Sequence, residues 1–325
     1  MFARLLNLSA LLVLLGCMFA PPLSTAQSYP QRPVRLEVGF PAGSTIDIVG
    51  RIVGQKLSDQ WRQPVVVENR AGATGNIATE LVAKATPDGY TLLTANNGLA
   101  VSAVLSRNLP FNARTDLTPL VQLSTSPHVL VVPASLPVNS VQELIKLARS
   151  QPGAINFASS GNGSADHMAA ELFKSVAKLD IVHVPYKGSP QALSDLAAGQ
   201  VTFYLPGIPA ALPLLKAGKI KALGISGTRR SAMAGDLPLL SEAGLPGMDA
   251  TIWYGIFVPA RTPREIVARL NADINHALSL REVQDRFLGL GMEAVGGSSA
   301  EFTRFFQSEL DRWAKFSAAT GFMLE

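Results

Sequence analysis

Short apolar runs alternate with longer amphipathic segments along most of this chain. Small residues follow most runs, and apolar positions then recur three or four residues apart, as at Ile46, Val49 and Val53. Predicted strands lie at 34–40, 65–67, 90–95, 120–124, 128–132, 155–157, 181–185, 201–205, 220–225 and 252–258. This alternation predicts an α/β protein whose mostly parallel sheets are flanked by helices, with ligands at the carboxyl ends of the strands.

Four helix starts are predicted from a Ser or Thr that is followed three residues later by Glu. In this box the hydroxyl accepts from a free N–H of the first turn, and the Glu carboxylate accepts from the N-cap N–H. The boxes are Ser140 with Glu143, Thr262 with Glu265, Ser279 with Glu282, and Ser298 with Glu301. A fifth start is predicted at Ser189, because Pro190 fits the first helical position.

Two predicted strands lead through loops of small residues into helices. The loop 41–44 follows the strand 34–40, and the loop 159–163 follows the strand 155–157. Ser164 stands at the N-cap position of the second helix, and the glycines leave backbone N–H groups uncovered. Such a helix end attracts a carboxylate or phosphate, typically by about 0.3–1 kcal/mol. Micromolar affinity needs roughly 8 kcal/mol, so a second wall is expected to face the first.

The segment 1–26 has the pattern of a secretory signal peptide. Arg4 precedes an almost wholly apolar stretch, and small residues lead to a predicted cleavage point after Ala26. The proline pair at 21–22 ends this stretch before the roughly 20 residues that a spanning helix needs. The sequence up to Cys17 also fits a lipoprotein processing site, so anchoring through this cysteine is an open alternative. Either route predicts export from the cytoplasm.

Composition argues against several classes of protein. Cys17 is the only cysteine, so the mature chain is expected to have no disulfide. His128, His183 and His276 have no partner at metal-ligand spacing, and we expect no metal site and no cofactor. The formal charge of +4 is scattered without runs, which does not favour binding to nucleic acid. A hydrophobic content of 47% supplies a large core, and chains of this length usually form two domains.

Enzyme motifs are incomplete in this chain. Gly161 and Gly163 lack the third glycine of a dinucleotide fingerprint, because position 166 is Asp. There is no G-x-S-x-G elbow, and the pair Gly218-Lys219 lacks the Ser or Thr of a phosphate-binding loop. We therefore expect a protein that is not an enzyme. An α/β enzyme acting on a carboxylate is the least favoured interpretation.

Six motifs occur in an order that resembles a known receptor family. They are Phe40-Pro41-Ala42-Gly43-Ser44-Thr45-Ile46-Asp47, Val65-Val66-Val67-Glu68-Asn69-Arg70, Pro87-Asp88-Gly89-Tyr90-Thr91-Leu92, Ser160-Gly161-Asn162-Gly163-Ser164 with His167, Val184-Pro185-Tyr186-Lys187-Gly188, and Glu242-Ala243-Gly244-Leu245-Pro246-Gly247. Together they resemble the Bug or TctC-type solute receptors of tripartite tricarboxylate transporters. The resemblance spans the mature chain.

The resemblance implies a fold and a domain plan. The expected fold is a two-domain periplasmic binding protein, a type II-like Venus flytrap that closes on its ligand. Domain one is expected to comprise 27–126 and 251–325, with 127–250 inserted as domain two. The protein is expected to be a periplasmic monomer with its ligand cleft between the domains.

A function also follows from the resemblance. The expected ligand is a small carboxylate, whether an organic acid, an amino acid or an aromatic acid. The expected partners are the membrane components of a tripartite transporter, to which the receptor delivers its ligand. A receptor that reports its ligand to a signalling partner is the alternative.

The resemblance and the loop chemistry together predict the ligand-binding residues. They are Pro41, Ala42, Gly43, Ser44, Asp47, Thr94, Asn96, Ser160, Gly161, Asn162, Gly163, Ser164, Pro206 and Gly207. Many relatives have a second glycine in place of Ser44, and an Asp-Asn pair in place of Pro206-Gly207. Losing that pair makes the pocket wall less polar, so we expect a ligand with an apolar portion.

Several of these residues have a second interpretation. Asp47 is expected either to contact a ligand amine or hydroxyl, or to act as a first-turn acid paired with Arg51. Ser160, Asn162 and Ser164 are expected either to donate to a carboxylate or to serve only as turn and cap residues. His167 is expected to pack or cap rather than bind ligand, and Lys187 to be solvated or near a hinge.

Overall fold

The computed structural model describes residues 29–227, 235–248 and 250–324. The predicted signal segment 1–26, with both of its processing alternatives, lies outside the described residues. From Arg32 onward the chain forms one compact unit. Among the described helices, none is both long and apolar enough to cross a membrane.

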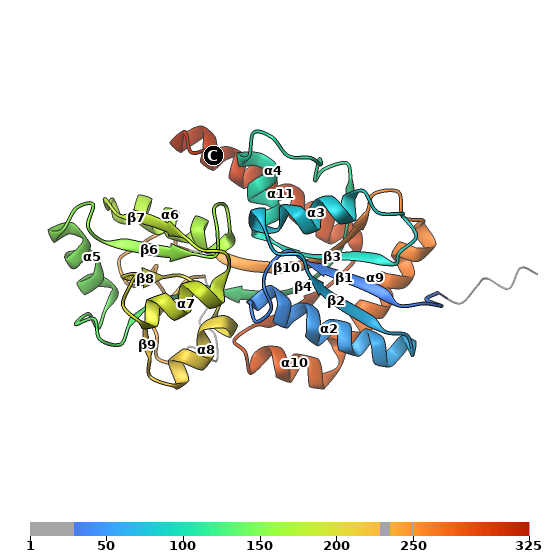
Figure 1. Ribbon diagram of the computed structural model, residues 1–325, viewed down its shortest axis with the longest axis horizontal. Helices are drawn as coiled ribbons and strands as arrows, with labels where there is room; N and C mark the ends of the chain where they lie inside the picture. Colours follow the sequence, from blue (N-terminus) through green and yellow to red (C-terminus); the bar gives the residue numbers. More distant parts are fainter. Residues whose placement is uncertain (1–28, 228–234, 249, 325) are drawn as a thin grey trace, which may run out of the picture. The chain divides into compact units, whose positions relative to one another are not determined.

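The first sheet has six strands in the order β11-β4-β10-β3-β1-β2 (Figure 1). Its strands are β1 (Val34–Val38), β2 (Val65–Asn69), β3 (Thr91–Asn96), β4 (Leu117–Pro127), β10 (Thr251–Pro259) and β11 (Glu293–Gly296). The pairs β1–β2 and β1–β3 are parallel, and the pairs that β10 and β11 make are antiparallel. Around this sheet lie α2 (Thr45–Trp61), η1 (Ala73–Gly75), α3 (Asn76–Ala83), α4 (Asn97–Leu105), α9 (Arg264–Ser279), α10 (Arg281–Leu288) and α11 (Ser299–Thr320).

The second sheet has five strands in the order β7-β6-β8-β5-β9. Its strands are β5 (Val129–Pro133), β6 (Asn156–Ser159), β7 (Val182–Pro185), β8 (Phe203–Tyr204) and β9 (Ile220–Ile225). Here β6 pairs in parallel with β7 and β8, whereas β5 pairs antiparallel with β8 and β9. The helices of this part are α5 (Val141–Ser150), α6 (Ala165–Ala177), α7 (Ser189–Ala197) and α8 (Ile208–Lys216).

Both sheets follow one topology. In the first sheet, β1 lies between β2 and β3, and the antiparallel strand β10 separates β3 from β4. In the second sheet, β6 lies between β7 and β8, and the antiparallel strand β5 separates β8 from β9. That antiparallel strand, β10 or β5, enters just after the chain has crossed from the other sheet. This crossing makes each sheet mixed and adds antiparallel pairs to the predicted parallel ones. The predicted two-domain α/β fold is confirmed, while the exact domain bounds stay a prediction.

Two crossing segments are joined where the chain passes between the sheets. The backbone N–H of His128 donates to Ser226 Oγ at 2.8 Å, and the N–H of Ser226 donates to the His128 carbonyl at 2.9 Å. Beside them, Pro127 of β4 pairs with Thr251 of β10. The connections are therefore held to each other by one backbone-to-side-chain bond and one backbone-to-backbone bond, next to the pairing of β4 with β10.

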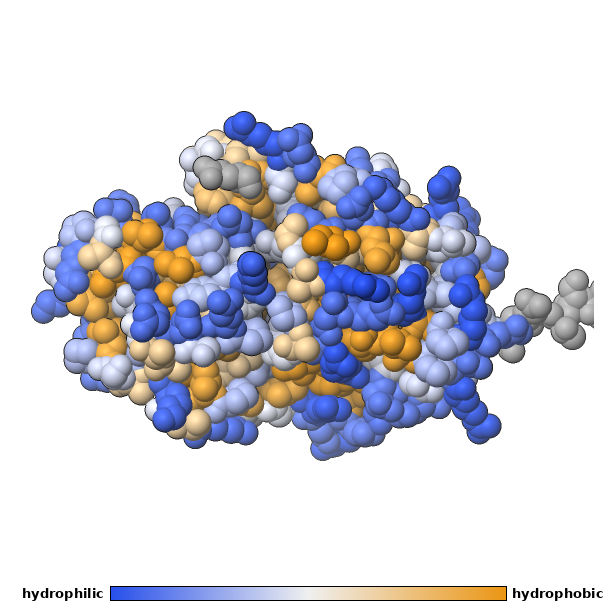
Figure 2. All heavy atoms as spheres, in the orientation of Figure 1, coloured by the Kyte–Doolittle hydropathy of each residue, from blue (hydrophilic) through white to orange (hydrophobic). Residues whose placement is uncertain are grey.

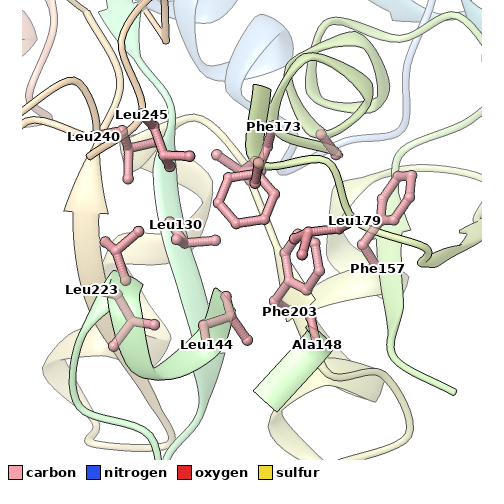
Figure 3. Close-up of a cluster of buried hydrophobic side chains, with 14 of the residues drawn as sticks. Leu130, Leu144, Ala148, Phe157, Phe173, Leu179, Phe203, Leu223, Leu240 and Leu245 are labelled. Carbon is pink, nitrogen blue, oxygen red and sulfur yellow. The ribbon is translucent and has the colours of Figure 1, made fainter. Parts of the chain in front are cut away.

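Apolar side chains fill the space between sheet and helices in each half. In the second half, Leu130 and Phe203 come from strands, Leu144 from α5 and Phe173 from α6, and all four are buried (Figure 3). In the first half, the rings of Trp253, Phe257, Phe302 and Phe306 pack around one another. On the face shown in Figure 2, hydrophilic residues cover much of the surface and interrupt the apolar patches.

Two of the four predicted Ser/Thr-x-x-Glu boxes start helices through their hydroxyls. Ser298 forms the full box with Glu301, and Ser140 accepts from the Glu143 N–H. Ser140 and Ser298 are therefore confirmed as N-caps.

For the other two boxes, the prediction that the hydroxyl caps the helix is wrong. Thr262 Oγ1 donates back to the Pro259 carbonyl, and Ser279 Oγ donates back to the His276 carbonyl. These hydroxyls serve the preceding turn, so α9 and α10 begin without a side-chain cap. At the fifth predicted start, α7 begins at Ser189 with Pro190 in its first turn, as expected.

Glu37 is a buried acid on β1 whose carboxylate oxygens have no hydrogen-bond partner in the described residues. Burial and then the charge of Glu68 raise the pKa of Glu37, although Arg70, with its Nε 3.5 Å from the carboxylate, opposes the shift. Ionised Glu37 therefore destabilises the fold, and this cost appears as the pH rises above the unfolded-state pKa.

We expect Glu37→Gln to raise the free energy of unfolding at pH 7.5 by about 1 kcal/mol, because it removes a buried charge. The gain should shrink as the pH falls towards 4.5, because the folded wild-type carboxyl becomes protonated above the unfolded-state pKa. Urea unfolding at the two pH values measures the difference. Glu80→Gln, a change on α3 beside Lys84, is the control and should stay within about 0.5 kcal/mol of wild type. An equal gain at both pH values would contradict the assignment.

Candidate functional site

A pocket of about 690 Å³ lies between segments that follow strands of both sheets. Its walls come from the ends of β1, β2, β6 and β7, from α4, and from the C-terminal segment. The lining residues are Gly39, Phe40, Pro41, Ala71, Gly72, Ala73, Thr74, Asn76, Ser102, Ser106, Ser160, Gly161, Asn162, Pro185, Tyr186, Lys187 and Leu324. Among these lining residues, Lys187 is the only lysine, arginine, aspartate or glutamate.

A second cavity, of about 30 Å³, adjoins this pocket and shares Phe40 and Ser160 with it. It lies between the start of α2 and the start of α6. Its lining is Phe40, Ser44, Thr45, Ile46, Asn96, Ser160, Ala165, Asp166, Ser189, Gly207, Ile252 and Tyr254. The volume is enough for one or two waters or a carboxylate group, and the larger pocket has room for the rest of a small metabolite.

The loop before α2 is fixed by Asp47. Its carboxylate accepts from the Gly43 N–H at 3.0 Å, from Arg51 Nε at 3.0 Å and from Asn69 Nδ2 at 2.9 Å. Burial favours a higher pKa for Asp47, but the bonds from Arg51, Gly43 and Asn69 hold it below its usual value. The contacts match the interpretation as a first-turn acid with Arg51, and Asp47 lines neither of these two cavities.

Ser44 leaves the start of α2 uncapped. Its hydroxyl donates to the Pro41 carbonyl at 2.7 Å, so no side chain caps the helix. Within the described residues, the backbone N–H groups of Thr45 and Ile46 have no acceptor, and both residues line the small cavity. This helix end is where the site keeps free backbone donors for an anion.

The loop before α6 is different, because its donors are already used. The N–H of Ser160 donates to Asp166 Oδ2, that of Gly161 to Ser159 Oγ, and that of Gly163 to His167 Nδ1. We expected these glycines to leave N–H groups open, and for Gly161 and Gly163 that expectation is wrong. Side chains from the same loop and helix reach back and fill them.

Ser164 and His167 cap α6 as expected. Ser164 Oγ accepts from the His167 N–H at 3.2 Å, and the ring of His167 closes the loop through Gly163. His167 is buried and stacks on His183 with 3.8 Å between ring centroids. The packing interpretation of His167 is therefore confirmed.

The remaining predicted residues line the two cavities or lie close to them. Asn162 lines the large pocket, and Asn96 lines the small one with its side-chain oxygen accepting from the Gly98 N–H. Thr94 is buried beside a cavity of about 10 Å³, and its hydroxyl has no partner in the described residues. Ala42, Gly43, Gly163 and Ser164 flank the lining residues of their loops, and Pro206 precedes Gly207 with its carbonyl used by the Val129 N–H.

Sequence reasoning missed three parts of the pocket. The loop 71–76 contributes a wall in which Ala73 and Thr74 have φ of 44° and 54°, a conformation that non-glycine residues adopt only under constraint. Thr74 Oγ1 donates to the Asn162 carbonyl at 2.5 Å and joins the two sides. Leu324 lines the same pocket, and Asp166 lines the adjoining small cavity. The glycines at 72 and 75 marked a loop in the sequence, but no motif indicated its direction.

No group of three or more potential metal ligands occurs in the part of the chain that the structure describes. The polar side chains that line the small cavity are hydroxyls, an amide and one carboxylate, Asp166. This arrangement suits hydrogen bonding to a polar solute.

The sequence profile of TctC, described as a tripartite tricarboxylate transporter family receptor, matches residues 49–322. The chain belongs to this receptor family. Receptors of the family are periplasmic binding proteins. The receptor is 35% identical to the protein BugT of Bordetella pertussis over 327 residues, which covers 98% of this chain and 100% of BugT.

Two solved structures are similar to the receptor over most of its length. R. palustris Rpa4515, determined with adipate, has 36% identity and a TM-score of 0.88, covering 91% of this chain and 99% of its own. MatC of Rhodopseudomonas palustris, determined with malate, has 32% identity and a TM-score of 0.84, covering 88% of the receptor and 99% of MatC. Both relatives bind carboxylates, which supports a carboxylate-binding receptor.

The stacked histidines should make the receptor sensitive to acid. Burial, followed by the charges of His183 and Lys174, lowers the pKa of His167 to about 3. Burial is also the main cause that lowers the pKa of His183 to about 4, against the nearby Asp166. An unfolded histidine has a pKa near 6.5, so the folded state binds fewer protons below that pH.

We expect the free energy of unfolding to fall as the pH drops from 6.5 towards 4.5. In His183→Gln the slope over this range should be shallower by as much as about 1.4 kcal/mol per pH unit, because one titrating ring is gone. Urea unfolding at half-unit steps gives both slopes. Between pH 7.5 and 9 the two proteins should show parallel curves. Identical slopes below pH 6.5 would contradict the prediction.

Proposed function

We propose that this receptor binds one small carboxylate in the space between its two sheets and presents it to the membrane components of a tripartite transporter. The observation that carries the proposal is the uncapped start of α2, where Thr45 and Ile46 have free N–H groups among the described residues and line the small cavity. A carboxylate placed there gains from these donors and from the helix dipole.

Other groups complete the proposed binding of the carboxylate. The side-chain oxygen of Asn96 accepts from Gly98, and Asn96 lines the same cavity, so we propose that its NH₂ group donates to the carboxylate. Lys187 provides the cation of the larger pocket, where a second anionic group or a polar tail would lie. Aliphatic and small residues form much of the remaining wall, in line with a ligand that has an apolar portion.

Family membership supports the rest of the proposal. The carboxylates in Rpa4515 and MatC support the ligand class, and the family description supports a transporter as the partner. We further propose export through the segment 1–26, a monomeric mature protein, and closure between 27–126 with 251–325 and the inserted 127–250.

A thermal-shift panel of dicarboxylates, tricarboxylates, amino acids, aromatic acids and neutral sugars tests the ligand class. A carboxylate at about one hundred times its Kd should add roughly 2.7 kcal/mol and raise the Tm by several degrees. The sugars serve as the control. A shift with a sugar and with no carboxylate would overturn the proposal.

Gly207 offers a second test, because it approaches the opposite wall closely. A Cβ at this position would lie 3.1 Å from Thr45 Oγ1, 3.2 Å from Ile252 Cδ1 and 3.3 Å from Tyr254 Oη. Since Gly207 borders the small cavity, we expect Gly207→Ala to weaken carboxylate binding and Gly207→Val to weaken it by about tenfold or more. Calorimetric titration measures the graded loss, and unchanged affinity in Gly207→Val would place the ligand elsewhere.

A further inference from the structure

Asp166 is the buried carboxylate of the small cavity, and its contacts decide how the neighbouring hydroxyls point. It accepts five hydrogen bonds: from the Ser160 N–H, the His167 N–H, and the hydroxyls of Ser160, Ser164 and Tyr204. No lysine or arginine is among these partners. A carboxylate accepts and does not donate, so each of the three hydroxyl protons is directed to Asp166.

The orientation of these protons makes the wall on the α6 side an acceptor. Ser160 lines the cavity at 2.8 Å from Asp166 Oδ1, and with its proton used it has only lone pairs for a ligand. Tyr204 has one proton and gives it to Asp166, so its 3.1 Å contact with Ser189 Oγ is a hydrogen bond only when Ser189 donates. Ser189 lines the cavity, and in that arrangement only its lone pairs are left for a ligand. Our expectation that Ser160 and Ser164 donate to a carboxylate does not agree with this arrangement.

The opposite wall has the reverse character. Thr45 and Ile46 have free N–H groups among the described residues, and Asn96, whose side-chain oxygen is used by Gly98, lines the same cavity. Ser44 turns its own proton away to Pro41. The cavity is therefore polarised, with donors on the α2 side and acceptors on the α6 side. An anion that occupied both sides equally would meet unpaired acceptors and the negative charge of Asp166.

We propose that the receptor selects carboxylates that carry a hydrogen-bond donor next to the carboxylate, namely 2-hydroxy or 2-amino acids, over the same acids without that donor. The carboxylate lies at the start of α2, and the hydroxyl or ammonium group donates to Ser160 and Ser189. This inference rests on the proposed function of the site. A buried acceptor left unpaired by a donor-free ligand supplies the discrimination.

The test compares acids matched in chain length and different only at carbon 2. One series is succinate, malate and aspartate, and the second is adipate, 2-hydroxyadipate and 2-aminoadipate. Calorimetric titration of the mature protein should give at least tenfold tighter binding for a hydroxy or amino acid than for its unsubstituted partner. In Asp166→Asn that ratio should fall about tenfold, because the carboxamide donates as well and frees hydroxyl protons for the ligand.

Two further variants keep the test decisive. Ser160→Ala removes one acceptor without removing Asp166, and it should weaken binding of the hydroxy and amino acids more than that of the unsubstituted acids. Asp59→Asn is the same chemical change on an exposed part of α2 and should keep the wild-type ratio. Melting curves establish that each variant is folded.

The outcomes separate this inference from the proposed function. Wild-type binding of succinate or adipate at least as tight as that of the substituted acids would overturn the inference and leave carboxylate binding standing. A ratio unchanged in both Asp166→Asn and Ser160→Ala would overturn the role of the polarised wall. Absence of binding by every acid, in a folded protein, would overturn the proposed function and the inference together.

Discussion

The site depends on the way in which two first-turn carboxylates shape the loops that precede their helices. Asp47 holds the loop before α2 through Gly43, and Asp166 holds the loop before α6 through Ser160. In both cases a short acidic side chain near a helix start gains from the helix dipole and from backbone N–H groups. Both loops are therefore hydrogen-bonded to the helices that follow them.

The two carboxylates differ in whether a positively charged side chain neutralises them. This difference gives the two walls of the cavity opposite hydrogen-bonding character. Asp47 is paired with Arg51, so the wall near it carries little excess charge. The partners of Asp166 are hydroxyls and backbone groups, so its negative charge remains on the α6 side of the cavity. One helix start can therefore hold an anion, whereas the other favours a donor. A receptor built in this way distinguishes the two ends of a polar ligand.

Much of the fold could be predicted from the sequence, because it depends on patterns that are local. Apolar runs and helical spacing predicted the strands and most helices, and Ser298 and Ser164 capped the helices expected of them. The failures at Thr262 and Ser279 have a local cause too, since each hydroxyl reached the turn behind it. Sequence spacing does not decide between these two directions.

The site was predicted less completely because its key contacts join distant residues. The proton of Tyr204 goes to Asp166, 38 positions away along the chain, and Thr74 meets Asn162 across the pocket. Asp166 entered the sequence argument only as the residue that broke a glycine fingerprint. The role of Asp166 depends on which side chains the sheet and helices place beside it. A linear sequence motif does not specify those neighbours.

The pairing of His128 with Ser226 has a mechanical consequence. In the proposed closure, the two crossing segments would turn together as a single pivot, because they are bonded to each other at His128 and Ser226. A small turn about such a pivot displaces nearby atoms little and distant ones in proportion to their lever arm. The residues at the far rim of each half therefore travel furthest for a given rotation, and a surface that spans both rims would register occupancy of the pocket most strongly.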